Sequence, residues 1–271
     1  MTLVYVLVLS FILYAIKIDL SSSIKEVGTS IHSFVIENIS NKNKSEITSK
    51  NEKDLTQSKD NGQVNNLILK EKVVLDAPVI SQLPELERGC EVTSLAMLLQ
   101  YGGVKVSKLQ LAKEVEKDLS PLTWKNGQKY YGNPYRGFVG DIYSKSKPGL
   151  GVYHEPIERL AEKYLPEQII NLTSGDFNQV LSYLSKDVPV WVIINTEYKH
   201  LPEHYFETWY TAEGPVSVTY KEHSVLVTGY DQEYIYFNDP LTNMKNRKAP
   251  IADFEAAWVQ MGRQAITIKS N

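Results

Sequence analysis

The sequence predicts an α+β fold, with helices in the first part of the domain and an antiparallel sheet in the second. Between residues 90 and 186 apolar side chains recur at helical spacing, whereas short β-branched runs dominate after residue 189. Two of these runs flank the pair Asp231-Gln232, as in a hairpin. With 42% hydrophobic and 23% charged residues, the 271-residue chain has a globular composition.

The first twenty residues are predicted to form an N-terminal membrane anchor. Residues 3–16 are apolar apart from Ser10, and a helix over residues 1–20 would span about 30 Å if Lys17 reached the headgroups. A cleaved signal segment fits less well, because no basic residue precedes the run and no small-residue cleavage site follows it. We expect a cell-membrane protein with its domain outside the cell. Secretion is the alternative, and Lys17 and Lys25 would by themselves favour the cytoplasm.

Residues 21–73 are predicted to form a disordered polar tether. Ser, Asn, Lys, Glu, Asp, Thr and Gln dominate this segment, which therefore cannot bury enough apolar surface to offset its ordering entropy. A small N-terminal subdomain with a helix near residues 33–39 is the alternative. Residues 74–271 are then long enough for one domain of ordinary size.

Four helices are expected in the first part of that domain. Apolar residues from Val92 to Leu99 surround the first helix almost completely, so it should be central and end at Gly102. The second should begin after a Ser107 cap and run to about residue 117. The third covers residues 156–164, and Thr173 or Ser174 would cap the fourth, residues 176–186.

The remaining elements are expected to build the sheet. Residues 189–195, 222–230 and 233–240 have the composition of strands. A short helix over residues 251–260 and a last strand over residues 264–269 complete the chain.

The single cysteine, Cys90, is the candidate nucleophile. One cysteine excludes an intramolecular disulfide and a multi-cysteine zinc site. Cys90 follows Gly89 at the start of the predicted central helix, where free N–H groups and the helix dipole would stabilise a thiolate. A lone cysteine can equally be an inert buried hydrophobic residue.

The chain offers five histidines as a possible base: His32, His154, His200, His204 and His223. His32 lies in the predicted tether, and His154 is better placed to cap a helix. Pro202 interrupts the helical spacing of His200 and His204, so we expect no metal site there. No other cofactor is indicated, and His223, at the start of an apolar strand, remains.

Asp239 is the candidate partner of His223. A two-residue turn at Asp231-Gln232 would place position 223 opposite 240, with the Asp239 side chain on the wrong face of the sheet. We therefore expect a three-residue turn or a β-bulge in this hairpin. His223 would then accept the proton of the thiol, and the Asp239 carboxylate would orient the imidazole. A strand-end histidine and a turn aspartate without function are the alternative.

Four stretches carry a resemblance to a known family: APVISQLPELERGCEVTSLAMLLQYGG, GVYHEPIERLAEKY, HSVLVTGYDQEYIYFNDP and FEAAW. Over residues 74–268 the chain resembles the stand-alone, C39-like bacterial branch of the bacteriocin-leader peptidase superfamily. The resemblance implies a papain-like fold, a catalytic triad of Cys90, His223 and Asp239, and Gln82 in the oxyanion hole. A peptide or protein would be the substrate.

The chain departs from the family pattern at two places. Members fused to export transporters usually have glycine after the nucleophile, whereas Glu91 stands here and no transporter domain follows. Cleavage of double-glycine leaders is therefore not implied. The segment Leu86-Glu87-Arg88 stands where relatives commonly have a proline.

Two classes of function remain open. The first is a thiol hydrolase that cleaves peptide or amide bonds through a thioester, with transfer to an amine as a variant. The second is a papain-fold module that binds peptide or cell-wall material without turnover. Nucleic acid is an unexpected partner for a net charge of −3. Aromatic residues that could form a wall beside the thiol or a satellite core are Trp124, Tyr130, Tyr131, Tyr135 and Phe138.

Overall fold

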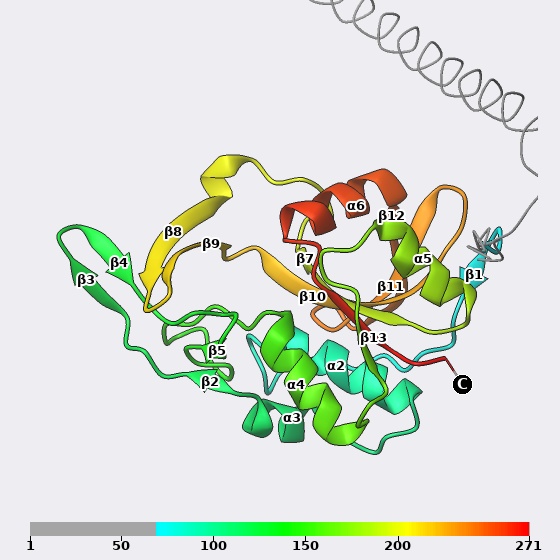
Figure 1. The fold of residues 1–271 in the computed structure, drawn as a ribbon, viewed down its shortest axis with the longest axis horizontal. Helices are drawn as coiled ribbons and strands as arrows, with labels where there is room; N and C mark the ends of the chain where they lie inside the picture. Colours follow the sequence, from blue (N-terminus) through cyan, green and yellow to red (C-terminus); the bar gives the residue numbers. More distant parts are fainter. Residues whose placement is uncertain (1–68, 271) are drawn as a thin grey trace, which may run out of the picture. The chain divides into compact units, whose positions relative to one another are not determined.

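A computed structural model describes residues 69–270, in which an antiparallel sheet is covered by helices on both faces (Figure 1). The sheet has seven strands. Six follow one path in the order β12 (Met244–Pro250), β11 (Tyr234–Asp239), β10 (Glu222–Tyr230), β7 (Val190–Asn195), β13 (Ala265–Ile268) and β6 (Ile169–Asn171). The seventh strand, β1 (Val73–Val74), pairs with β10. Strands β7 and β10 lie in the middle and are buried along their whole length, as expected for the centre of a sheet covered on both sides.

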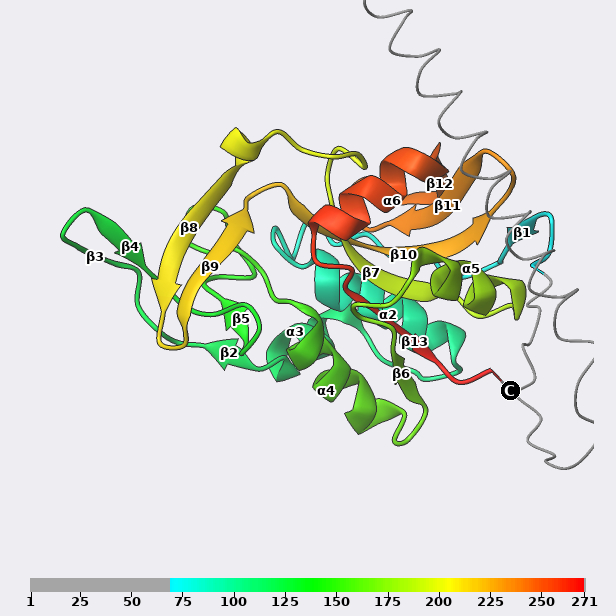
Figure 2. The same cartoon turned by 45° about the horizontal axis from the view of Figure 1, so that its top comes forward.

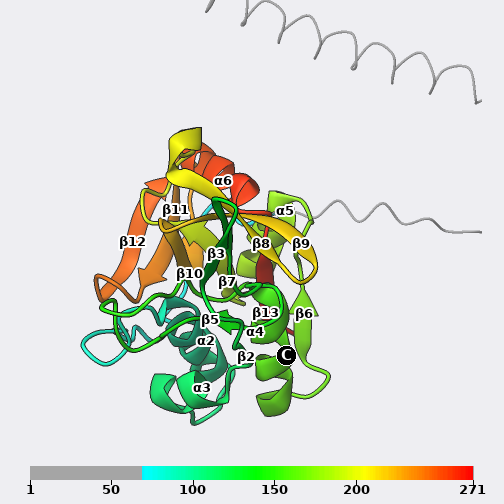
Figure 3. The ribbon, with the colours of Figure 1, turned by 90° about the vertical axis from the view of Figure 1, so that its left-hand side faces the viewer.

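Three helices cover one face of the sheet: α2 (Cys90–Tyr101), α3 (Lys108–Glu114) and α4 (His154–Tyr164). Their apolar side chains form one core cluster with Trp191, Ile193 and Leu226 from the central strands. Ten of the twelve residues of α2 are buried, so this helix is central, as its sequence predicts. Figure 3 shows α2, α3 and α4 together on one side of the strands.

The other face carries α5 (Phe177–Ser185) and α6 (Ile251–Gln260). Residues of alternate parity in the same strands, such as Val192 and Val225, join these helices in a second core cluster. This alternation follows from the two-residue period of a strand, which sends neighbouring side chains to opposite faces. The central strands are thereby fixed from both sides, which gives a rigid base for any residue at their ends.

A smaller sheet of four strands lies at the end of the domain away from β1 (Figures 1 and 2). It contains β3 (Thr123–Lys125), β4 (Gln128–Tyr130), β8 (Phe206–Thr211) and β9 (Gly214–Thr219). A 3-10 turn, Glu203–Tyr205, precedes β8, and β2 (Lys117–Asp118) pairs with β5 (Phe138–Val139). Trp209 and Val218 hold this sheet to the body of the domain through a third apolar cluster.

The predicted α+β class and antiparallel sheet are confirmed, and several boundaries differ. The second helix ends at Glu114, because Val115 takes extended backbone angles. The fourth helix is capped by Asp176, whose carboxylate accepts the Asn178 N–H, and not by Thr173 or Ser174. Strands β8 and β9 were not expected from the sequence.

The predicted anchor, residues 1–20, lies outside the described residues, as does most of the predicted tether, residues 21–73. Within residues 69–270 no helix is both long enough and apolar enough to cross a membrane. Val73, assigned to the tether, forms part of β1.

Candidate active site

Cys90 is the first residue of α2, and two hydrogen bonds fix this end of the helix to the sheet. The Ser94 hydroxyl donates to the Ser224 carbonyl at 3.0 Å, and the Trp191 indole N–H donates to the Glu91 carbonyl at 3.0 Å. All of these groups are buried. The thiol is therefore held at a constant position relative to the start of β10, where His223 lies.

Gly89 is required before the nucleophile because of Leu86. A Cβ atom at residue 89 would lie 2.4 Å from the Leu86 Cβ, and Leu86 is fully buried. The φ angle of Gly89 is −114°, which any residue can adopt. Close packing against Leu86 at the helix start therefore explains the glycine.

Substitution Gly89→Ala should destabilise the domain by about 1–3 kcal/mol, because the methyl group overpacks the site against Leu86. Urea unfolding measures this effect, and because Gly89 is the N-cap of α2, where alanine is less favourable than glycine, the capping preference acts in the same direction. Unchanged stability would contradict the packing explanation.

A β-bulge in the β10–β11 hairpin brings His223 and Asp239 onto one face of the sheet. Near the turn Tyr230 pairs with Ile235, whereas beyond the bulge Leu226 pairs with Asn238. The extra residue shifts the register by one position and so turns the Asp239 side chain to the face that carries His223. The distance from His223 Nε2 to Asp239 Oδ1 is 2.9 Å. The irregularity predicted from the sequence is thus present as a bulge.

Asp239 is fully buried, and its carboxylate accepts several hydrogen bonds. Its Oδ2 accepts from the Tyr198 hydroxyl at 2.9 Å, the Thr242 hydroxyl at 2.7 Å and Arg247 Nη1 at 2.8 Å. Burial would raise the pKa of this carboxyl, but hydrogen bonds from His223, Thr242 and Tyr198 outweigh burial and hold the pKa well below its usual range. Asp239 is therefore a fixed carboxylate that orients the imidazole.

The predicted residues Gln82, Cys90 and His223 line one pocket, with a volume of about 280 Å³. Asp239 lies behind His223 and is not part of the pocket wall. The rest of the wall consists of Glu87, Arg88, Lys145, Leu150, Thr196, Thr219, Tyr220, Glu222 and Leu241. The structure thus brings three of the four predicted residues to one cavity and places the fourth, Asp239, in hydrogen-bond contact with His223.

Gln82 is held in place by backbone groups. Its N–H donates to the Pro240 carbonyl at 2.8 Å, next to Asp239 in the chain. Its side-chain Nε2 donates to the carbonyls of Leu86 at 3.1 Å and Glu87 at 3.3 Å, whereas Oε1 is buried without a partner among residues 69–270. The amide therefore lies in the pocket wall with its donors directed at the loop that precedes Cys90.

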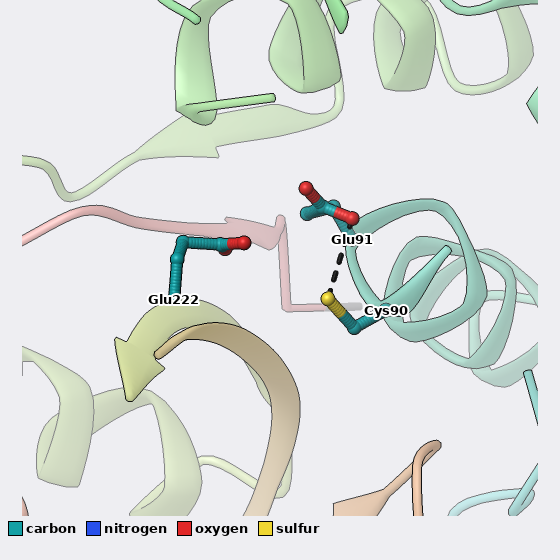
Figure 4. Close-up of side chains that lie close together, drawn as sticks. All are labelled: Cys90, Glu91 and Glu222. Carbon is teal, nitrogen blue, oxygen red and sulfur yellow. Dashed lines mark hydrogen bonds between the residues drawn. The ribbon is translucent and has the colours of Figure 1, made fainter. Parts of the chain in front are cut away.

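Two buried acidic residues stand beside the thiol (Figure 4). The Cys90 thiol donates to Glu91 Oε2 at 3.3 Å, and the Val152 N–H donates to Glu91 Oε1 at 2.7 Å. Ligand-type atoms of Cys90, Glu91 and Glu222 all lie within 4.8 Å of one another. No metal site is predicted from the sequence, and no local pattern indicates this cluster, because Glu91 and Glu222 are 131 positions apart.

The acidic cluster opposes ionisation of the thiol. Burial, followed by the negative charges of Glu91 and Glu222, raises the pKa of Cys90 well above its usual value. Burial also raises the pKa of Glu91 to about 7, and burial together with Glu91 raises that of Glu222 well above its usual value. The thiolate expected at this helix N-terminus is therefore disfavoured until another group balances the acids.

The aromatic residues proposed as a wall beside the thiol do not line the pocket. Trp124 is 67% exposed on β3, and Phe138 is fully buried in the main core. Tyr131 packs edge-on against Trp209 with ring centroids 5.4 Å apart, within the third apolar cluster. The satellite-core alternative is the correct one for Tyr131, and most of the residues that line the pocket have polar side chains.

Comparison with known proteins gives the family. The sequence profile of the Peptidase_C39 like family matches residues 74–266. The chain belongs to the peptidase C39-like family.

Two relatives support this assignment of the C39-like chain. The uncharacterized protein YvpB of Bacillus subtilis strain 168 is 46% identical over 197 residues, which cover 72% of this chain and 75% of YvpB. A crystal structure of a C39-like peptidase candidate from Bacillus anthracis is 47% identical, with a TM-score of 0.70, and the match covers 74% of this chain and 99% of that one. The papain-like arrangement expected from the resemblance is therefore the fold of this C39-like domain.

Proposed function

We propose that the domain is a thiol hydrolase that cleaves peptide or amide bonds through Cys90, His223 and Asp239. The observation that carries this proposal is the 2.9 Å hydrogen bond between His223 and Asp239 in a structure where His223 shares a pocket with the only thiol of the chain. Membership of a peptidase-like family supports the same reaction class.

In the proposed mechanism each ring nitrogen of His223 has its own role. Because Nε2 bonds to Asp239, Nδ1 is the nitrogen left to accept the Cys90 proton. The thiolate then attacks the substrate carbonyl carbon, and the imidazolium returns its proton to the leaving amine as the C–N bond breaks. Attack of water on the thioester, with His223 as base, releases the acid and restores the thiol.

Gln82 would help to stabilise the oxyanion together with the Cys90 N–H. The hydrogen bond from Gln82 Nε2 to the Glu87 carbonyl is long, at 3.3 Å. Little energy is therefore lost when this N–H turns toward a developing negative charge. The backbone bond from Gln82 to Pro240 ties this donor to the loop that carries Asp239.

The second candidate function is binding without turnover. The raised pKa of Cys90, caused by burial and by Glu91 and Glu222, favours this alternative because it favours the neutral thiol.

The pH dependence of Cys90 alkylation by iodoacetamide tests the proposal, since the chain has one cysteine. We expect native Cys90 to react at a measurable rate near pH 7 and the rate to fall at least tenfold in His223→Ala. His204→Ala, which removes a histidine outside the pocket, should leave the rate unchanged. A thiol that reacts only after unfolding would instead support the binding module.

The location of the domain is proposed from the sequence alone. The apolar run of residues 3–16 supports an N-terminal anchor with the domain outside the cell. Separation of cells that express the full chain into membrane and soluble fractions tests the anchor. Protease treatment of intact cells tests whether the domain lies outside the cell.

A further inference from the structure

We propose that Glu222 and Glu91 form a subsite for a substrate ammonium group directly beside the Cys90 thiol. The inference rests on the proposed hydrolase and names the chemical class of its substrate: a peptide or amide with a primary amine close to the bond that is attacked. It concerns the part of the pocket that the hydrolytic steps themselves do not use.

Glu222 has an unpartnered oxygen in this position. The residue is 9% exposed, and its Oε1 is buried without any hydrogen-bond partner in the described part of the chain. Glu222 lines the pocket, and Figure 4 shows its carboxylate directed toward Glu91 and the thiol. An unpaired buried carboxylate oxygen is costly, which makes a bound donor the expected complement.

The local backbone is shaped to leave room for both acids. A Cβ atom at residue 151 would lie 2.2 Å from Glu91 Oε1 and 2.9 Å from Glu222 Oε2, so a side chain in place of Gly151 would displace both carboxyl groups. The next residue, Val152, orients Glu91 through its N–H. The acid pair therefore has a supporting loop and is not an accident of surface charge.

No cation of the described residues 69–270 neutralises the pair by an ion pair. Arg88, in the pocket wall, donates to the carbonyls of Asp141, Ser144 and Lys145, which commits its guanidinium to the loop. Lys145 also lines the pocket, but the carboxyl groups of Glu91 and Glu222 both lie within 4.8 Å of the sulfur. The groups nearest the reacting atom are therefore two acids that no basic side chain of residues 69–270 pairs with.

An ammonium group satisfies this site in two ways. It donates to the free oxygen of Glu222, and its positive charge offsets the two acids that raise the pKa of the thiol. Substrate binding would thus favour the thiolate at the moment when a carbonyl carbon is present. A neutral substrate of the same size would lack both effects.

Charge-matched thiol reagents test the subsite without a known substrate. We would compare 2-aminoethyl and 2-hydroxyethyl methanethiosulfonate on the full chain at pH 7 in the presence of EDTA. The thiolate attacks the sulfenyl sulfur, forms a disulfide and releases methanesulfinate. Each rate is divided by the rate on the same protein unfolded in urea, so that intrinsic reactivity cancels.

The native protein should favour the ammonium reagent over the hydroxyl reagent by about tenfold, as expected for one unit charge at short range. Glu222→Gln should lose this preference. The matched control, Glu87→Gln, removes the same charge from the same pocket wall and should retain the preference. Glu222→Ala serves as a second variant, and circular dichroism establishes that each variant is folded.

Three results would overturn the subsite. One is equal loss of the preference in Glu87→Gln, which would assign it to the general field of the pocket. Another is rapid reaction of native Cys90 with no preference for either reagent. The third is protection of Cys90 by micromolar Zn²⁺ in a protein without charge preference, which would assign the acids to a metal. Failure of the hydrolase is distinct, because Cys90 would then react slowly with every reagent.

The two sources of an ammonium group can also be separated. Alanyl chloromethyl ketone carries a free N-terminal amine, whereas Nα-acetyl-lysyl chloromethyl ketone carries the amine on its side chain. Faster alkylation of Cys90 by the first, lost in Glu222→Gln, would assign the subsite to an N-terminus, and the reverse order would assign it to a lysine side chain. Equal rates for both that do not change in Glu222→Gln would contradict an ammonium subsite.

Discussion

Asp239→Asn should lower the turnover of the proposed hydrolase by about 10³-fold or more. Of the substitutions next to His223 but outside the pocket wall, it should also cause the largest loss of Cys90 reactivity. Asparagine can offer an N–H to His223 Nε2 and so favours the wrong tautomer of the ring. In that orientation the amide oxygen still accepts from the Tyr198 and Thr242 hydroxyls, but Arg247 faces a neutral group and the Leu241 N–H loses its acceptor at Oδ1. We therefore expect a loss of stability of about 3 kcal/mol as well.

Asp231→Asn is the matched control, since Asp231 also accepts backbone N–H bonds in the same hairpin. Its carboxylate receives the N–H groups of Glu233 and Tyr234, but it lies at the exposed turn. This variant should lower stability slightly and leave Cys90 alkylation unchanged. Equal effects of the two substitutions would contradict the special role of Asp239.

The stability effect of Asp239 also has a defined pH dependence. Because its pKa is lower in the folded state, the folded protein binds this proton less tightly than the unfolded chain. Its contribution is present above the unfolded-state pKa of about 4 and is lost as the pH falls toward the folded value. Native and Asp239→Asn proteins should therefore converge in stability as the pH is lowered below about 4, which urea unfolding at several pH values measures.

Local sequence signals predicted those parts of the site that depend on local structure. The position of Cys90 at a helix start follows from Gly89 and the apolar run after it, and the need for a bulge follows from the face that Asp239 must occupy. The order of the helices and of strands β7, β10 and β11 could be predicted for the same reason, since each has a clear period.

The remaining parts of the site depend on contacts between distant residues, which no local pattern reports. Tyr198, in a loop, and Arg247, in β12, both donate to Asp239. Glu222 lies beside Glu91 because the first residues of β10 and of α2 are close together in space. The departure from the transporter-fused members at Glu91 was a visible signal, but its partner was not. Strands β8 and β9 contain Pro215 and many polar residues, so neither has a strong apolar alternation.

Glu91→Gln should stabilise the domain at neutral pH while having little effect near pH 4.5. Burial raises the pKa of Glu91 to about 7, so the folded protein binds this proton more tightly than the unfolded chain does. The stability linked to this proton is complete below the unfolded pKa of 4.5 and falls as the pH rises to about 7. The difference amounts to about 3 kcal/mol, and glutamine, which does not ionise, removes it.

Urea unfolding at pH 4.5 and 7.5 measures this effect, with Glu87→Gln as the control that should keep the native pH dependence. Equal loss of stability from pH 4.5 to 7.5 in native protein and Glu91→Gln would contradict a buried acid with a raised pKa. Iodoacetamide should also alkylate Cys90 faster in Glu91→Gln, because one of the two charges that oppose the thiolate is gone. If the domain becomes both more stable and more reactive without Glu91, then neither folding nor the basal reactivity of the thiol explains why an acid stands at this position. Recognition of a cationic substrate would then account for Glu91 beside the thiol.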